Sequence, residues 1–258
     1  MIPSESNTID VLRAPLISGA RALFTTRHGG AGHGNFASAN LGRHVGDDPE
    51  IVEANRALLA RAIGAPLVFV DQVHGTDVLA LAAVDPVPVS EIPVTAADAI
   101  VTDRSDIALA IMVADCLPVL MCDSDAGVVA AAHAGRRGLL DGVLAATVEQ
   151  MVTLGARPDR VRAVVGPSVC GACYEVPEQM RAQSAVILSA TSAVTSWGAP
   201  ALDLRAGAIQ ALIACGLEHE RINADAPCTL EDEAFFSYRR SPRTGRFAGV
   251  IRLDPVAG

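Results

Sequence analysis

Hydrophobic residues gather in short, nearly unbroken runs in the centre of the chain. Runs rich in Val, Ile and Ala without polar alternation are typical of strands buried on both faces. Three such strands are expected, over Ile107–Val113, Pro118–Cys122 and Gly127–Ala132. Similar runs predict strands over Ala20–Thr26, Leu67–Val73, Val161–Val165 and Phe247–Leu253. The chain is therefore predicted to have a core rich in sheet.

Apolar residues at helical spacing predict helices between these strands, over Pro49–Ile63, Leu139–Leu154, Pro177–Leu188 and Asp203–Leu217. Asp47 or Asp48 can cap the first of them, and Gly64 can end it. The three prolines of Val84–Pro93 predict an irregular segment. No linker lies between Gly64 and Arg162, so residues 1–258 are expected to form a single mixed α/β domain.

The composition excludes several classes of protein. With 50% hydrophobic and 19% charged residues among 258, the chain is not a disordered one. It has 20 basic and 29 acidic residues, a net charge of -9, and only 3% aromatic residues, which argues against nucleic acid as a partner. All the basic residues are arginines. The lack of lysine excludes Schiff-base enzymes, P-loop NTPases and protein kinases.

The distribution of apolar residues and cysteines favours a cytoplasmic protein with no membrane partner. Residues 1–17 lack the cationic start and unbroken apolar stretch of a secretory signal. The longest apolar run, Ile107–Cys122, contains Asp115 and Pro118 and is too short to span a bilayer. Six cysteines are too few for a disulfide scaffold, so they are expected to serve as ligands, nucleophiles or core residues.

Three candidate metal ligands follow predicted strands: His74, Cys116 and His133. Two imidazoles and a thiolate form either a catalytic zinc site with one open position or a trigonal copper site. These residues are 42 and 17 positions apart and match no short metal-binding motif. From spacing alone, a buried cysteine and two histidines that cap turns remain the alternative.

Seven motifs in the chain occur in a characteristic order: Phe24–Gly30, Ala39–Pro49, Gln72–Gly75, Ala114–Pro118, His133–Gly138, Tyr174–Val176 and Phe236–Arg240. Together they resemble the YfiH family, also called the laccase-domain or multicopper polyphenol oxidase family, over residues 24–253. The resemblance implies a layered α/β/β/α fold with a mixed sheet, similar to that of cytotoxic necrotising factor. It also implies a purine nucleoside phosphorylase that acts on adenosine, inosine and methylthioadenosine and deaminates adenosine. The oligomeric state is left open.

The same resemblance implies the site residues. A metal, zinc or else copper, would be held by His74, Cys116 and His133, and the catalytic residues would be Cys116, His133 and Asp115. Purine nucleoside and phosphate would be bound by Arg27, Asn40, His44, Gln72, Arg137 and Arg239. Arginine suits phosphate because its planar fork stays charged, although surface or core salt bridges are an alternative role. Arg136 stands where the family motif commonly has Trp, which affects substrate preference.

Three other functions fit the same residues. The resemblance also implies that copper in the same site would make the protein an oxidase of phenols. Without metal, Cys116 as nucleophile and His133 as base would make a hydrolase or amidase. The resemblance implies peptidoglycan precursors as its substrates. Metal binding without turnover is the third.

The remaining cysteines carry weaker signals. Cys170-Gly-Ala-Cys173 is compatible with a redox pair or an auxiliary metal site, but a loop of small residues is favoured because Pro177 separates it from the next helix. Cys122, Cys215 and Cys228 are expected to be small buried hydrophobic residues.

Overall fold

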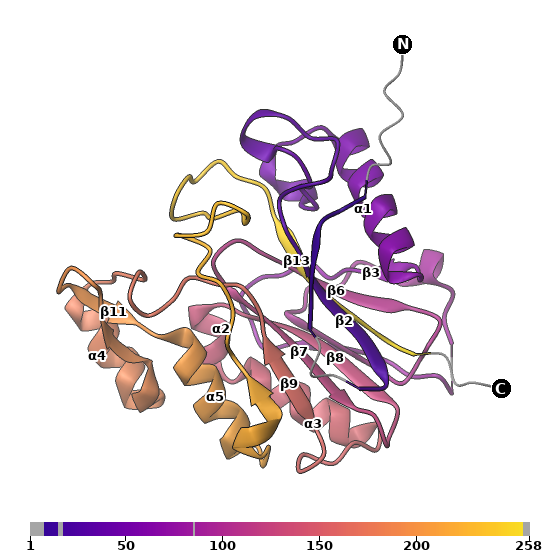
Figure 1. The fold of residues 1–258 in the computed structure, drawn as a ribbon. Helices are drawn as coiled ribbons and strands as arrows, with labels where there is room; N and C mark the ends of the chain where they lie inside the picture. The colour runs from indigo at the N-terminus through magenta and orange to yellow at the C-terminus, as the bar shows by residue number, and fades with distance from the viewer. Residues whose placement is uncertain (1–7, 15–17, 85, 255–258) are drawn as a thin grey trace.

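Two β-sheets packed face to face, with helices on both outer sides, form the protein (Figure 1). This computed structural model describes residues 8–14, 18–84 and 86–254. Much of residues 1–17, on which the prediction about a secretory signal depends, lies outside the described residues. None of the helices in the described part of the chain combines the length and apolar character that crossing a membrane requires.

The first sheet has five strands in the order β1-β2-β13-β6-β3. Their bounds are β1 Val11–Arg13, β2 Ala20–Thr25, β3 Leu67–Val68, β6 Ala108–Val113 and β13 Phe247–Leu253. All neighbours pair antiparallel except β3 and β6, which are parallel. The C-terminal strand β13 thus lies between strands from the first half of the chain.

The second sheet has six strands in the order β12-β9-β7-β8-β5-β4. Their bounds are β4 Val78–Leu81, β5 Ala99–Thr102, β7 Leu117–Asp123, β8 Val128–Ala134, β9 Arg162–Val165 and β12 Ile222–Asn223. The outer pairs are parallel and the inner three pairs are antiparallel, so this sheet is mixed as well.

The helices are α1 Pro49–Ile63, α2 Arg136–Asp141, α3 Val143–Thr153, α4 Glu178–Ile187 and α5 Leu204–Ala214. A two-stranded hairpin, β10 Ser192–Val194 with β11 Pro200–Leu202, accompanies α4. Short 3-10 helices cover Gly34–Phe36, Arg43–Val45, Val89–Glu91, Ser189–Thr191 and His219–Arg221. The predicted α1 is confirmed: the Asp48 side chain accepts the Glu50 amide at its start, and Gly64 ends it at a φ of 77°.

Alternating side chains along the central strands explain the layers. In β6, Leu109 and Ile111 pack between the two sheets, whereas Ala108 and Ala110 face the outer layer that contains α1. In the second sheet, the inward positions complete the core between the sheets, and the outward positions pack against α2, α3 and α5. Both faces are therefore buried, as unbroken apolar runs predict. The predicted α/β/β/α architecture is confirmed.

Two predicted elements differ from the structure. The helix predicted over Leu139–Leu154 is two helices, α2 and α3, because Gly142 adopts a left-handed φ of 100° between them. The strand predicted over Leu67–Val73 ends at Val68, because the chain then leaves the first sheet and Asp71 pairs with Ala96 beside the second.

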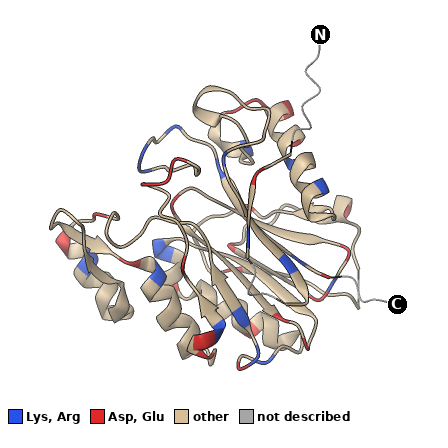
Figure 2. Ribbon diagram, viewed as in Figure 1, with Lys and Arg blue, Asp and Glu red and all other residues tan. Residues whose placement is uncertain are grey.

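Charged residues lie mostly on loops and helices, and the central strands are almost free of them (Figure 2). All basic residues in this view are arginines, since the sequence has no lysine.

Candidate active site

A cavity of about 490 Å³ lies where the loops after β3, β6 and β9 and the loop before β13 meet the end of β8. This volume suits a small-molecule ligand. Seven of the ten predicted site residues line the cavity: His44, Gln72, His74, Asp115, Cys116, His133 and Arg239. Its other lining residues include three that sequence analysis did not assign to substrate, which are Tyr174, Tyr238 and Arg246.

The three predicted metal ligands meet at one wall of this cavity. The side-chain ligand atoms of His74, Cys116 and His133 all lie within 4.8 Å of one another. Cys116 Sγ is 3.8 Å from His74 Nε2, and the two imidazole rings form an edge-to-face pair with centroids 4.7 Å apart. His133 is buried, whereas His74 is exposed to the cavity. A ligand could therefore approach the group from the side of His74.

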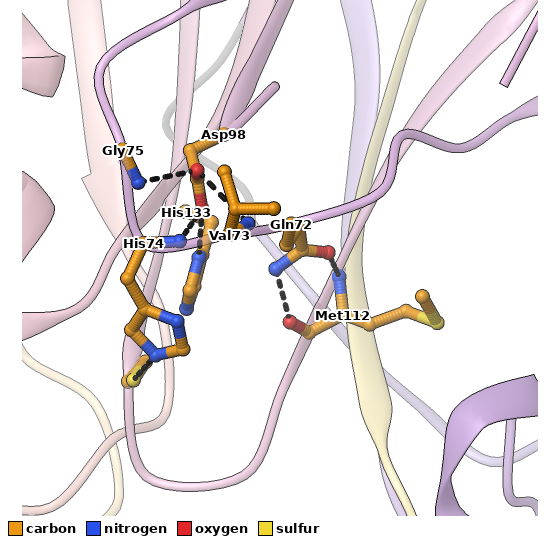
Figure 3. Close-up of polar contacts among 8 residues, drawn as sticks. Gln72, Val73, His74, Gly75, Asp98, Met112 and His133 are labelled. Atoms are coloured by element: carbon orange, nitrogen blue, oxygen red, sulfur yellow. Dashed lines mark hydrogen bonds and ion pairs between the residues drawn. The ribbon is translucent and has the colours of Figure 1, made fainter. Parts of the chain in front are cut away.

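The carboxylate of Asp98 contacts the imidazole of His133 and the main chain of His74 (Figure 3). Its Oδ1 lies 2.7 Å from His133 Nδ1 and accepts the His74 amide at 3.0 Å. Its Oδ2 accepts the amides of Val73 and Gly75 at 3.1 and 2.6 Å. Burial opposes ionisation of Asp98, but these hydrogen bonds outweigh it and lower the pKa of the carboxyl. Because an ionised carboxylate only accepts, His133 donates through Nδ1 and keeps Nε2 for a ligand.

The backbone at two of these positions is unusual. His74 has a φ of 60° and Asp115 a φ of 89°, in the left-handed region that side chains other than glycine rarely adopt. The three amides bound by Asp98 hold the His74 turn in this conformation. Non-glycine residues in the left-handed region gather at ligand sites, where surrounding contacts sustain the strain.

Gly135 leaves the space in which the ligand group sits. A Cβ atom at this position would lie 2.6 Å from His74 Cδ2 and 3.2 Å from Cys116 Sγ. Two imidazole nitrogens and a thiolate sulfur bound to tetrahedral zinc lie roughly 3.4–3.6 Å apart, so each donor would need to move by about 1 Å or less to close around an ion. The donor types, the second hydrogen bond of His133 and this space all fit a metal ion.

Cys116 and His133 form a strongly interacting pair. Burial by itself would raise the pKa of Cys116, but the charge and hydrogen bonds of His133 and His74 lower it to about 6. Burial would likewise lower the pKa of His133, and the Cys116 thiolate together with Asp98 raises it to about 9. Cys116 is therefore a thiolate at neutral pH, which is the form that binds metals and attacks electrophiles.

Asp115 is buried and fully hydrogen-bonded. Its Oδ1 accepts the Thr229 hydroxyl at 2.7 Å, and its Oδ2 accepts the Arg239 amide at 2.7 Å. The Arg239 guanidinium then lies 4.6 Å from the centre of the Tyr174 ring and donates to the carbonyl of Glu175 at 2.8 Å. Asp115 thus joins the loop of Cys116 to the loop of Arg239.

Cations and aromatic rings occupy the other walls. Arg136, Arg239 and Arg246 line the cavity with His44. The pKa of His44 is lowered, first by burial and then by the charge of Arg246. Tyr174, Tyr238 and Met112 add apolar surface. Gln72 also lines the cavity, but its amide is bound to the main chain of Met112 at 2.7 and 2.8 Å (Figure 3).

Three predicted substrate-binding residues do not line this cavity. Arg137 forms an ion pair with Asp141 at 3.5 Å, and its side chain is 72% exposed. Arg27 donates to the carbonyl of Ala37 and lies over the ring of Phe236. Asn40 is buried, where its Oδ1 accepts the amides of Gly42 and Arg246. Arg27 and Asn40 therefore contact other loops, and Asn40 supports the loop of Arg246.

Asp98 is the most important residue that sequence analysis missed. It follows the short run Ala96–Ala97 and belongs to none of the recognised motifs. Its one signal is an acidic residue that directly precedes the apolar run Ala99–Val101, where an unpaired charge would be costly to bury.

A fold of two packed sheets, with a thiolate and two imidazoles at one wall of a cavity, defines an α/β protein with a candidate metal-binding active site. The chain belongs to the multi-copper polyphenol oxidoreductase laccase family, whose family model matches residues 21–254. This confirms the resemblance in the sequence motifs.

Curated relatives span nearly the whole chain. A purine nucleoside phosphorylase of Streptomyces griseus is 49% identical over 244 residues, covering 93% of this chain and 97% of the relative. A purine nucleoside phosphorylase of Corynebacterium glutamicum is 45% identical, over 92% of this chain and 96% of the relative. One of Deinococcus radiodurans is 41% identical, over 97% of this chain and 95% of the relative.

Solved structures share the fold. The YfiH protein of Bacillus licheniformis superposes with a TM-score of 0.86 at 29% identity, covering 97% of this chain and 98% of that protein. YlmD from Geobacillus stearothermophilus also gives a TM-score of 0.86, at 33% identity and 98% coverage of both chains. The fold class is thus shared along almost the entire chain.

Proposed function

We propose that this protein is a purine nucleoside phosphorylase that uses adenosine, inosine and methylthioadenosine and also deaminates adenosine. The names of the curated relatives support an enzyme of this kind. The observation that carries the proposal is one cavity that combines a His74, Cys116 and His133 group with three arginines and two tyrosines. Phosphate, purine and a metal could meet there.

The arginines suit inorganic phosphate. Arg136, Arg239 and Arg246 line the cavity, and a guanidinium can bind two phosphate oxygens at once. Burial is the main cause of the lowered pKa of Arg246, and a site shielded from water strengthens its attraction for an anion. In this assignment Arg136 and Arg246 replace Arg27 and Arg137 as phosphate ligands, and Arg239 keeps its predicted role.

The aromatic side chains suit the purine ring. Tyr174, Tyr238 and Met112 line the same cavity and offer flat or polarisable apolar surface. In phosphorolysis a phosphate oxygen bonds to the ribose C1′ while the bond from C1′ to the base nitrogen breaks. The base leaves with that electron pair and takes up a proton. Phosphate bound to the arginines and a base stacked on a tyrosine would have their reacting atoms held together.

His74, Cys116 and His133 would hold the metal, for which we propose zinc. Zinc bound by three protein ligands supplies Lewis acidity and activates water for hydrolytic reactions such as deamination. Asp98 fixes the ring of His133 and the turn that carries His74, so the His133 imidazole and the His74 main chain are held before a ligand arrives. Asp115 has both carboxylate oxygens engaged, which favours a positioning role over proton transfer.

The site of His74, Cys116 and His133 depends on a reduced thiol, so the protein is expected to operate in the cytoplasm, where cysteines stay reduced. All six cysteines are free thiols in the structure.

Two other functions have a specific observation in their favour. The family description, together with the two histidines and one cysteine, suits copper and the oxidation of phenols. The lowered pKa of Cys116 beside His133 suits a metal-free hydrolase or amidase. Phenol oxidation would require copper loading, and a hydrolase would keep its activity after complete removal of metal.

The test is the release of free base from each of the three nucleosides, with and without phosphate, on protein of known metal content. We expect release that depends on phosphate and is lost in Cys116→Ala, while the control Cys215→Ala, at the end of α5, keeps it. Ammonia release from adenosine without phosphate measures the deaminase. Absence of base release from zinc-loaded protein would refute the phosphorylase proposal.

A further inference from the structure

A second group of metal-binding side chains lies outside the candidate active site. The ligand atoms of Cys170, Cys173, Cys228 and Glu231 all lie within 4.8 Å of one another. Two segments that are 58 residues apart supply them, one after β9 and one after β12. Within the described residues, only this group and the one at His74 bring potential ligands together in this way.

The two segments have matching local structure. Cys170 and Cys173 are three residues apart, as are Cys228 and Glu231, and each pair is closed by a turn. The Cys173 amide donates to the Cys170 carbonyl at 3.0 Å, and the Glu231 amide donates to the Cys228 carbonyl at 3.2 Å. Pairs of cysteines with this spacing, separated by two other residues in a tight turn, are the usual donors of structural zinc sites.

A hydrogen bond joins the two turns at sulfur. The Cys170 amide donates to Cys228 Sγ at 3.4 Å. The main chain of the first turn is therefore in contact with a ligand atom of the second turn. Cys173 is 5% and Cys228 9% exposed, and they pack with Val169 and Leu230. Glu231 is exposed and lies at the open side of the group. The three sulfur atoms are thus largely shielded from solvent, and the Glu231 carboxylate lies on the exposed side of the group.

The surrounding backbone holds the turns together without using the sulfur atoms. Ser168 and Cys228 form an isolated parallel bridge, and the Thr229 amide donates to the Ser168 carbonyl at 3.1 Å. Arg205, on α5, donates to the Ser168 hydroxyl at 2.8 Å and to the Pro227 carbonyl at 2.6 Å. Such a framework reduces the ordering that metal binding would otherwise require.

We propose that Cys170, Cys173, Cys228 and Glu231 form a second, structural zinc site. Three soft thiolates select zinc over magnesium or calcium, and a fourth ligand completes a closed tetrahedral shell. A closed shell leaves no position for substrate, so the role is to fasten the two loops. This site departs from the loop of small residues favoured by the sequence, and it places Cys228 among the ligands.

Both fastened loops form part of the candidate active site. Tyr174 directly follows Cys173 and lines the cavity. Thr229 directly follows Cys228, and its hydroxyl binds Asp115 beside Cys116. The zinc ion would therefore hold Tyr174 at the cavity and keep Thr229 in contact with the carboxylate of Asp115. The proposal concerns metal binding and does not depend on the proposed enzymatic activity.

The first test measures zinc in the full-length Cys116→Ala protein, where the other site is disabled, after reconstitution under reducing conditions. We expect about one tightly bound zinc per chain, abolished by adding Cys228→Ser and retained on adding the control Cys215→Ser. Glu231→Gln, an exposed change that leaves the core intact, is expected to speed zinc release to a chelator at least tenfold. Absence of bound zinc in Cys116→Ala would overturn the proposal.

A second measurement does not depend on how the cysteine variants fold. Cobalt bound to the Cys116→Ala protein is expected to give intense thiolate-to-metal charge-transfer absorption, as three sulfur ligands require. Weak absorption without that band would overturn the proposal. So would mass spectrometry of non-reduced protein that found Cys170 and Cys173 joined in a disulfide after isolation without oxidant, because that result assigns the pair to redox chemistry.

Discussion

Asp98 Oδ1 lies 2.7 Å from His133 Nδ1, and the same carboxylate oxygen accepts the amide of His74 at 3.0 Å. One buried acid therefore contacts two of the three candidate metal ligands. We predict that Asp98→Asn lowers zinc affinity by about 10- to 100-fold, since an amide cannot accept all of these hydrogen bonds. Competition with a chelator measures the effect. Asp106→Asn, at an ion pair with Arg104, is the control, and equal affinity in both variants would contradict the assignment.

Gly135 should be sensitive to a single added methyl group. In Gly135→Ala the new Cβ would lie 2.6 Å from His74, so we predict loss of metal with little loss of stability. Gly142→Ala offers the opposite case, because open space surrounds it but its φ is 100°. That change should destabilise the fold by about 1–2 kcal/mol and leave metal binding intact. Metal analysis and thermal unfolding of both variants test this contrast.

Arg136 and Arg137 are adjacent in sequence but differ in position. Arg136 lines the cavity, whereas Arg137 is exposed beside Asp141. We predict that Arg136→Ala lowers kcat/KM for phosphorolysis about tenfold or more, because a charge-assisted hydrogen bond contributes about 1.5–3 kcal/mol. Arg137→Ala should stay close to wild type. Steady-state kinetics at varied phosphate concentration would refute this if both variants lost the same activity.

Removal of metal should expose a reactive thiol. In metal-free protein the pKa of Cys116 is about 6, so its thiolate predominates above that pH. We predict rapid alkylation of Cys116 at pH 7.5, with a rate that falls about tenfold for each unit below pH 6, and protection by added zinc. Burial raises the pKa of Cys122 to about 12, and this residue should not react. Peptide mapping after limited iodoacetamide treatment identifies the modified residue.

Local patterns in the sequence predicted two kinds of element: a helix defined by its own capping residues, and strands that are apolar along their whole length. The capped helix α1 and the interior strands β6, β7, β8 and β13 form close to where the pattern places them. The pattern failed at Gly142 and after Val68, where a left-handed glycine and a change of sheet decide the backbone. Such features depend on contacts distant in sequence. That the chain forms one domain stays a prediction.

The site was predicted only in part for the same reason. The sequence motifs supplied His74, Cys116 and His133, but Asp98 acts on His133 from 35 residues away. Arg137 was expected at phosphate because it lies in a motif, yet the first turn of α2 directs Arg136 to the cavity instead. Cys170 and Cys173 gave a visible motif, but their partners Cys228 and Glu231 become neighbours only in the folded chain.

The hydrogen bonds between Gln72 and Met112 affect whether another strand can pair with the edge of β6. Strand β3 covers only Ala108 and Leu109 of its neighbour β6, which leaves the rest of β6 at the margin of its sheet. At Met112 the Gln72 side chain binds both the amide and the carbonyl, as another strand would (Figure 3). The unpaired main-chain groups of an exposed strand edge can form hydrogen bonds with a strand of a second chain. The Gln72 side chain occupies the main-chain groups of Met112 that another strand would need, and so blocks pairing at this position of the β6 edge.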